Sequence, residues 1–126
     1  IEKAKGHSGN QAGYYPAEDT VSGSFVFKSG IQGAGLWCFD CFERVDEVKI
    51  IGTTGKLSFS VLGAEPIQMI NKQGVSKLVV EQPKHIQQPL IQSIVNQLNG
   101  IGVCPSTGES AARTAWVMDQ MMSEWE

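Results

Sequence analysis

The sequence predicts an α+β domain with a largely antiparallel six-strand sheet followed by two helices packed against it. Three observations lead to this fold class. Apolar residues alternate with period two from residue 20 onward, glycine-containing turns separate the short apolar runs, and the apolar period changes to three and four after Pro83. Short, evenly spaced runs favour an antiparallel meander over alternating βαβ units.

The first long strand is expected to begin at Thr20. Val21, Phe25 and Phe27 fall on one face, and polar residues alternate with them on the other. Lys28-Ser29-Gly30 then provides a hairpin turn, because glycine accepts the positive φ that such turns need. This segment is therefore a half-buried strand that leads into a hairpin.

The second strand is expected from about Gly35 to Phe42. It carries apolar side chains on both faces, which is typical of a strand covered on both sides. Four more strands complete the predicted sheet, at Val48–Ile51, Leu57–Val61, Ile67–Ile70 and Lys77–Val80.

Two helices follow the sheet. The first runs from about Ile86 to Leu98, with Pro89 in its first turn, where a missing N–H is tolerated, and it ends at Asn99-Gly100. Ser106-Thr107-Gly108-Glu109 has the pattern of a capping box and predicts the start of the second helix. The apolar stripe of that helix is expected at Ala111, Ala115, Met118, Met122 and Trp125.

The chain has 126 residues, which fits one domain, with residues 1–17 as a strand remnant and loop, 18–82 as the sheet and 83–126 as the two helices. A hydrophobic fraction of 41% is enough to bury one core. The charged fraction of 18% is below the roughly 25% that is usual, so both faces of its elements are covered or part of the surface meets a partner. Because the chain opens with Ile1, we expect it to be a piece of a longer protein.

Charge and hydropathy exclude two classes of partner. The net charge is −3 without a basic stripe, which disfavours nucleic acid, and no apolar run approaches the roughly 20 residues that cross a bilayer. Three cysteines, an odd number, argue against a disulfide framework and favour a reducing compartment. We therefore expect a cytoplasmic protein.

Several motifs resemble functional sites, but their sequence context does not support a catalytic or binding role. Cys38 and Cys41 form a CxxC, but on a strand their side chains point to opposite faces, so we expect structural cysteines that neither pair nor chelate without a bulge. Gly33-Ala34-Gly35 lacks the third glycine and the helix of a dinucleotide fingerprint. His7 and His85 have no catalytic partner at a suitable spacing. We therefore predict no catalytic, cofactor-binding or metal-binding residue in this chain.

Two other clusters have both a functional and a structural interpretation. Glu18-Asp19 is an acidic pair in which one carboxyl could have a raised pKa or meet a cation, unless it is simply a solvated strand entry. Trp37 and Phe39 could line a sugar site or form a contact with another subunit. The low charge around them favours the interface.

Taken in order, three segments of the chain resemble a known family. They are Tyr15–Phe25 with Gly30, Gly33 and Trp37 after it, Asp46–Leu57, and Cys104–Ala111. Together they resemble the C-terminal domain of the family of glucose–fructose oxidoreductase, inositol dehydrogenase and the rhizopine-catabolism enzymes. The resemblance covers nearly the whole chain from about Tyr14 onward.

This resemblance implies a parent enzyme that moves a hydride between NAD or NADP and a sugar or cyclitol. It implies an N-terminal Rossmann domain, and catalytic residues that precede Ile1. This domain would supply one pocket wall at Asp40, Phe42, Glu43 and Arg44, although Phe42 lacks the hydroxyl expected there. Its sheet face, with Trp37 and Phe39, would form the subunit interface of a homo-oligomer. The alternative is a non-enzymatic binding or assembly module that uses the same sheet.

Overall fold

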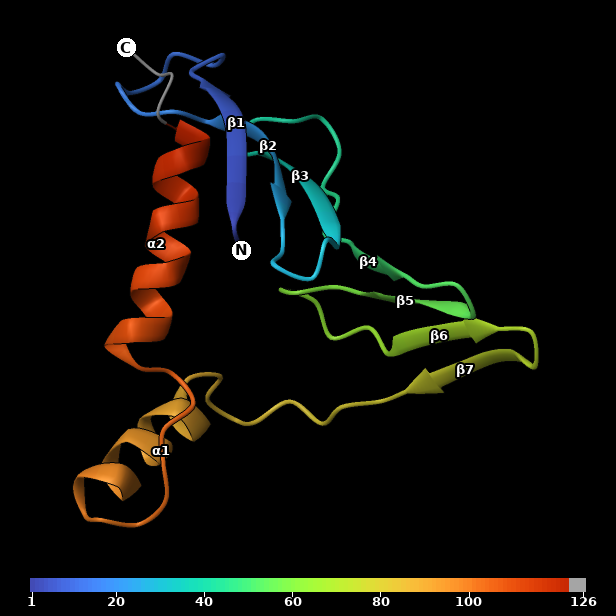
Figure 1. Ribbon diagram of the computed structural model, residues 1–126, viewed down its shortest axis with the longest axis vertical. Coiled ribbons are helices and arrows are strands. Elements are labelled where there is room, and N and C mark those ends of the chain that lie inside the picture. The colour runs from blue at the N-terminus through green and yellow to red at the C-terminus, as the bar shows by residue number, and fades with distance from the viewer. Residues whose placement is uncertain (123–126) are drawn as a thin grey trace. The chain divides into compact units, whose positions relative to one another are not determined.

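The computed structural model describes residues 1–122, and these form seven strands and two helices (Figure 1). They divide into two compact units. The first comprises residues 1–42 together with the chain from Cys104 onward, and the second comprises residues 43–103.

The sheet of the first unit has three antiparallel strands in the order β1-β2-β3. They are β1 (Lys3–Gly9), β2 (Thr20–Val26) and β3 (Gln32–Cys38). The expected hairpin joins β2 to β3. Gly30, with φ 84°, donates its N–H to the carbonyl of Phe27 at 2.8 Å, and the Phe27 N–H donates to Ile31 at the same distance. The predicted turn at residues 28–30 is therefore confirmed.

A row of glycines crosses this sheet. Gly6 pairs with Gly23, and Gly23 pairs with Gly35, so all three lie on one face. The same face carries the apolar residues expected of β2, Val21 and Phe25, because they are two residues from Gly23 on either side.

The glycine row allows α2 (Gly108–Met122) to approach β1 and β2 closely, as Figure 1 shows. Met121 of this helix is only 5% exposed. A Cβ atom added to Gly6 would lie 2.6 Å from the carbonyl oxygen of Ser22 and 2.9 Å from that of Met121. Any larger residue in β1 at this point would therefore push the helix and sheet apart.

The start of α2 differs by one residue from the expected capping box. The N–H of Ser110 donates to Oγ1 of Thr107 at 3.2 Å, and the N–H of Thr107 donates to Oγ of Ser110 at 2.9 Å. This is the reciprocal arrangement of a capping box, with serine in the place of the expected Glu109. The face that meets the sheet also differs from the predicted stripe, because it centres on Met121. Trp125 lies outside the described residues.

The second unit contains a four-stranded antiparallel sheet in the order β4-β5-β6-β7. Its strands are β4 (Val48–Ile51), β5 (Gly55–Phe59), β6 (Ile67–Asn71) and β7 (Gly74–Leu78). The register places a set of apolar side chains on one face: Val48, Ile50, Leu57, Phe59, Ile67, Met69 and Leu78.

Helix α1 (Gln88–Leu98) has Pro89 in its first turn and is followed by Gly100 with φ 75°, as the sequence predicts. Its apolar stripe is exposed, however. Among the described residues, α1 packs against none of the four strands of its unit. The expectation that both helices pack on the sheet therefore holds only for α2.

Asp46 organises the loop that follows β5. Its carboxylate accepts hydrogen bonds from the hydroxyl of Ser60 and from the N–H groups of Val61 (3.0 Å) and Leu62 (2.7 Å). These bonds, that from Ser60 first, lower the pKa of Asp46 from 3.8 to about 2. Val61 is part of this loop and not of the strand in which the sequence placed it.

The structure differs from the predicted single six-strand sheet. It has two sheets, and the residues before Pro16 provide a paired strand, β1, where only a remnant was expected. The division falls after β3, since residues 39–47 join no ladder. The two sheets are nonetheless both antiparallel meanders, and the α+β class is confirmed.

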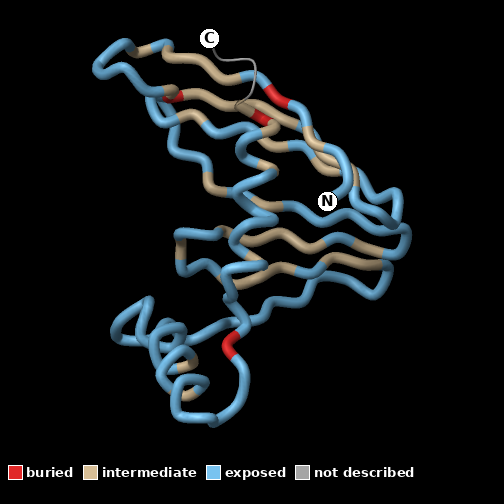
Figure 2. Tube along the Cα trace, turned by 60° about the vertical axis from the view of Figure 1, so that its left-hand side comes forward, coloured by how far each residue is buried: buried red, intermediate tan, exposed pale blue. Residues whose placement is uncertain are grey.

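Very few side chains of the described residues are buried (Figure 2). Cys104 and Met121 are the buried hydrophobic residues among them, and Asp19 is the buried charged one. The 41% hydrophobic content therefore lies largely on the surface of the described chain. Neither helix in residues 1–122 has the length and apolar character needed to span a membrane.

The contacts of the glycines predict the order in which Gly→Ala substitutions lower stability. Gly6→Ala should lower the free energy of unfolding by about 2 kcal/mol, because its Cβ meets backbone oxygens that cannot move alone. Gly23→Ala should cost less, since its Cβ meets the flexible Met121 side chain at 2.8 Å. Gly108→Ala, with open space around it, is the matched control. Urea unfolding of the three variants measures the order, and equal midpoints for Gly6→Ala and Gly108→Ala would contradict it.

Asp46 should make stability depend on acid pH. Its folded pKa is below its ordinary value of 3.8, so its contribution is complete above 3.8 and is lost as the pH falls through about 2. The difference in unfolding midpoint between wild type and Asp46→Asn should therefore be largest near neutral pH and shrink across this window. Glu47→Gln, which removes a carboxylate paired only at the surface with Lys49, is the control. A difference that is constant with pH would rule out this role for Asp46.

Candidate functional site

The loop between β1 and β2 is built by local side-chain hydrogen bonds. Asn10 accepts the N–H of Gly13 on its Oδ1 at 2.7 Å, and its Nδ2 donates to the carbonyl of Tyr15. Gly13 has a φ of 71°, a conformation that glycine adopts without strain. These bonds turn the chain so that Tyr14 and Tyr15 stand at the end of the three-stranded sheet.

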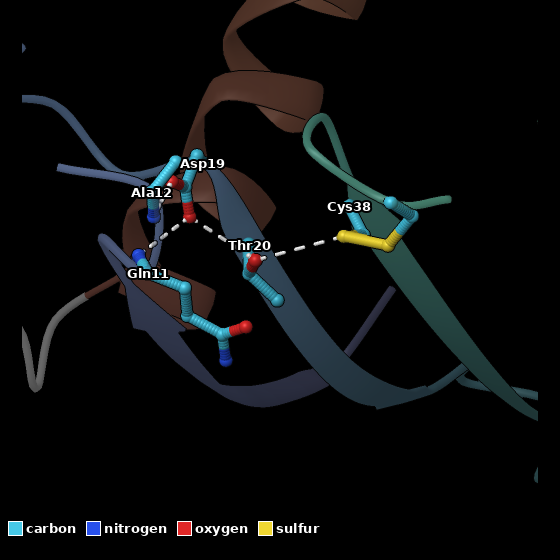
Figure 3. The surroundings of a disulfide bond; sticks show 6 residues. Gln11, Ala12, Asp19, Thr20 and Cys38 are labelled. Carbon is cyan, nitrogen blue, oxygen red and sulfur yellow. Dashed lines mark hydrogen bonds between the residues drawn. A yellow bond between two sulfur atoms is a disulfide. The ribbon is translucent and has the colours of Figure 1, made fainter. Parts of the chain in front are cut away.

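Asp19, the last residue before β2, ties this loop to the sheet (Figure 3). Its Oδ1 accepts the N–H of Gln11 at 2.9 Å and the hydroxyl of Thr20 at 3.1 Å, and its Oδ2 accepts the N–H of Ala12 at 2.7 Å. The N–H donors of Gln11 and then Ala12 lower the pKa of Asp19, and they outweigh burial, which raises it. The raised pKa considered for the acidic pair is therefore wrong for Asp19.

Cys38 and Cys41 form a disulfide, which corrects the expectation that they cannot pair (Figure 3). β3 ends at Cys38 and not at Phe42, because its partner β2 begins at Thr20, the residue paired with Cys38. Beyond that pair the chain bends, and the two Cα atoms come within 5.9 Å. The alternation of side chains that would separate them applies only to an extended strand.

The loop and the disulfide-closed turn meet in a small polar pocket of about 180 Å³. Its lining is polar and aromatic: Asn10, Ala12, Tyr14, Tyr15, Asp19, Phe39 and Asp40. Asp40 supplies an exposed carboxylate, and the two tyrosines supply hydroxyls that donate or accept. This set of groups suits a small ligand with several hydroxyls. The volume is below the roughly 300 Å³ at which drug-sized pockets begin.

Of the four residues predicted for a substrate pocket, Asp40 lies in this one. Phe42 has a fully exposed side chain, and Glu43 and Arg44 are exposed and belong to the second unit. The structure thus places Asp40 and Asp19 in the lining of one pocket, which their separation in the sequence did not suggest.

The two residues predicted for an interface line a larger apolar groove in the first unit, with a volume of about 1260 Å³. Trp37, 45% exposed, and Phe39, 78% exposed, form one side of it, and Met118 and Val117 of α2 form the other. The ring of Trp37 lies over Gly35, the member of the glycine row that α2 leaves uncovered. The groove therefore exists because α2 covers β1 and β2 but not β3.

Sequence reasoning missed Asn10, Tyr14 and Tyr15. The spacing of Asn10 and Gly13 was the available signal, because an asparagine three residues before a glycine is typical of a side-chain-stabilised turn. His7 pairs with Ser22, on the face opposite the glycine row, and is not among the residues that line the pocket. Within residues 1–122 there is no cluster of three side chains suited to a metal ion.

Comparisons with known proteins bear on what this site does. No family model matches the chain. A protein of Formosa agariphila named Oxidoreductase P35 is 35% identical over 100 residues, which is 79% of this chain. The chain is a relative of an oxidoreductase. The match covers 30% of that protein's length.

A solved structure of a provisionally assigned oxidoreductase from Thermotoga maritima has the same fold. It superposes with a TM-score of 0.72 over 94% of this chain, at 15% sequence identity. The chain covers 37% of that structure, so both of these proteins are about three times as long as the part they share with this chain. The likeness supports the α+β architecture described above.

Asp19 should control the order of the loop at the pocket. In Asp19→Asn one acceptor oxygen becomes an NH₂ that faces a backbone N–H, so Gln11 or Ala12 loses its partner. The amide exchange of these two residues should accelerate by roughly tenfold. Glu18→Gln, the neighbouring change, should leave it unaltered. Hydrogen exchange followed by NMR is the measurement, and equal acceleration in both variants would refute the role assigned to Asp19.

Proposed function

We propose that this chain is the substrate-side domain of an oxidoreductase that transfers a hydride between a nicotinamide, NAD or NADP, and a sugar or cyclitol. The identity of 35% with an oxidoreductase over 100 residues carries the proposal. The fold shared with a second, provisionally assigned oxidoreductase supports it.

The polar pocket supports the choice of a polyol substrate. Vicinal hydroxyls donate well to a carboxylate, which Asp40 supplies, and the phenols of Tyr14 and Tyr15 can donate to or accept from further hydroxyls. Phe39 offers an aromatic face to the C–H side of a ring. Asp19 has both oxygens engaged by the loop, so its role is to position the loop and not to bind the ligand.

The chemistry of hydride transfer is assigned to the rest of the complete protein. The pocket lining holds carboxylates and phenols but neither histidine of the chain, and a base for the alcohol proton would come from a companion domain. The relatives have about two thirds of their length outside the shared part, which is room for a nicotinamide-binding domain. Trp37 and Phe39 are proposed to meet another subunit or that companion domain through the apolar groove.

A second candidate function is a non-enzymatic binding or assembly module. The observation that favours it is the groove of about 1260 Å³, whose aromatic and methionine lining suits a protein partner better than a polyol. This alternative predicts association of the chain without any nicotinamide-dependent activity in the complete protein.

The proposal predicts a division of labour that can be measured. Residues 1–126 alone should not bind NADH or NADPH in a fluorescence titration, whereas the complete natural protein should bind one of them and reduce or oxidise a polyol from a panel of sugars and cyclitols. Asp40→Asn in the complete protein should raise KM by about tenfold, because one hydrogen bond to a charged group is lost. Glu47→Gln, outside the pocket, is the control.

Two results would argue against this assignment. Tight nicotinamide binding by residues 1–126 would place the cofactor site in this chain and not in the companion domain. A complete protein that oligomerises but neither binds a nicotinamide nor acts on any polyol would favour the assembly module instead.

A further inference from the structure

The disulfide closes a very small turn at the surface. Only Phe39 and Asp40 separate Cys38 from Cys41, and Cys41 is exposed. The turn lies at the end of β3 (Figure 3), and its residues Phe39 and Asp40 line the polar pocket. A reagent in solution can therefore approach Cys41 without any opening of the three-stranded sheet.

The two sulfurs are held differently. Cys38 is half-buried and paired with Thr20 in the β2–β3 ladder, and the next residue donates its N–H to the carbonyl of Asp19 at 2.8 Å. The hydroxyl of Thr20 lies 3.9 Å from the sulfur of Cys38. If Cys38 leaves as a thiolate, this hydroxyl, which otherwise donates to Oδ1 of Asp19, can turn to donate to the sulfur, and this favours attack at Cys41.

The geometry points to a site of thiol–disulfide exchange, and we propose that Cys38–Cys41 is reversibly reduced by dithiols and that its reduction releases Phe39 and Asp40 from the polar pocket. Both residues lie inside the disulfide-closed turn and both line the pocket. The proposal concerns the position of these residues and holds whatever ligand the pocket takes.

Reduction of the disulfide by a dithiol takes place in two steps. A thiolate of the dithiol attacks the Cys41 sulfur, the S–S bond breaks, and Cys38 leaves as a thiolate that takes a proton from water. The second thiol of the reductant then attacks its own sulfur in the mixed disulfide and expels Cys41, which is protonated in turn. Two electrons pass to the protein, and the dithiol becomes a cyclic disulfide.

The consequence for the pocket follows from chain entropy. The disulfide restricts the conformations of Phe39 and Asp40. When it is reduced, Asp40 belongs to a segment without β-sheet hydrogen bonds, because β3 ends at Cys38. The Phe39 N–H, which donates to the Asp19 carbonyl, then belongs to an open chain, so we expect this hydrogen bond to break more often after reduction.

The test is differential alkylation of the chain with mass spectrometry, combined with amide hydrogen exchange. Air-oxidised protein should take up no iodoacetamide at Cys38 or Cys41. Dithiothreitol should expose both thiols, and removal of the reductant in air should close them again. On reduction, the amide exchange of Phe39 should accelerate by about tenfold, whereas that of Gly23 in the centre of the sheet should not change.

Two variants complete the experiment. Cys41→Ser should exchange at Phe39 as fast as reduced wild type, and Cys104→Ser, which alters a buried thiol bonded to the Ser106 carbonyl, should behave as oxidised wild type. Because wild type is compared with itself across the redox change, the result stands even if Cys41→Ser folds poorly. Alkylation of Cys38 and Cys41 in air-oxidised protein would overturn the proposal, as would full reduction with no change at Phe39.

Discussion

The close approach of α2 to the glycine row of β1 and β2 is the contact on which the first unit depends. Gly6 and Gly23 leave room for Met121, which is one of the few buried side chains of the described chain. Because a helix of about 10 Å diameter cannot cover three strands, β3 remains uncovered on this face. The rings of Phe25 and Trp37 lie instead over Gly33 and Gly35, which shields glycine backbone that would otherwise be bare. The apolar groove is the direct result of that incomplete cover.

A second constraint acts at the end of the same sheet. β2 begins at Thr20, so the ladder with β3 cannot extend past Cys38. The unpaired chain must turn, and its turn brings Cys41 to Cys38 and places Phe39 and Asp40 beside the loop held by Asp19. The pocket, the disulfide and the loop therefore all depend on the register of β2 with β3. A change at one of them should alter the structure of the other two.

These two constraints explain which features the sequence could predict. Local signals were sufficient for the α+β class, for the turn at Gly30 and for the place of Pro89 in the first turn of α1, because each depends on residues close in the chain. The disulfide was missed because the apolar run from Leu36 to Phe42 has the composition of a strand, and only the register of its partner shows where pairing stops. The division into two sheets was missed for the same reason. The buried face of α2 was predicted wrongly because Met121 packs against Gly6 and Gly23, which are far away in the sequence. The periodicity of the helix alone does not reveal this contact.

Exposed apolar surface is not confined to the groove beside β3. The apolar face of the β4–β7 sheet and the stripe of α1 both carry large exposed side chains, such as Ile50 and Ile91, that a free domain in water would not retain without cause. The charged fraction of the chain is 18%, below the roughly 25% that is usual. The companion domain or second subunit proposed above would bury such faces. The polar pocket differs in this respect, because its hydroxyl and carboxylate groups are stable in water, and it is the part of the surface best suited to receive a small ligand.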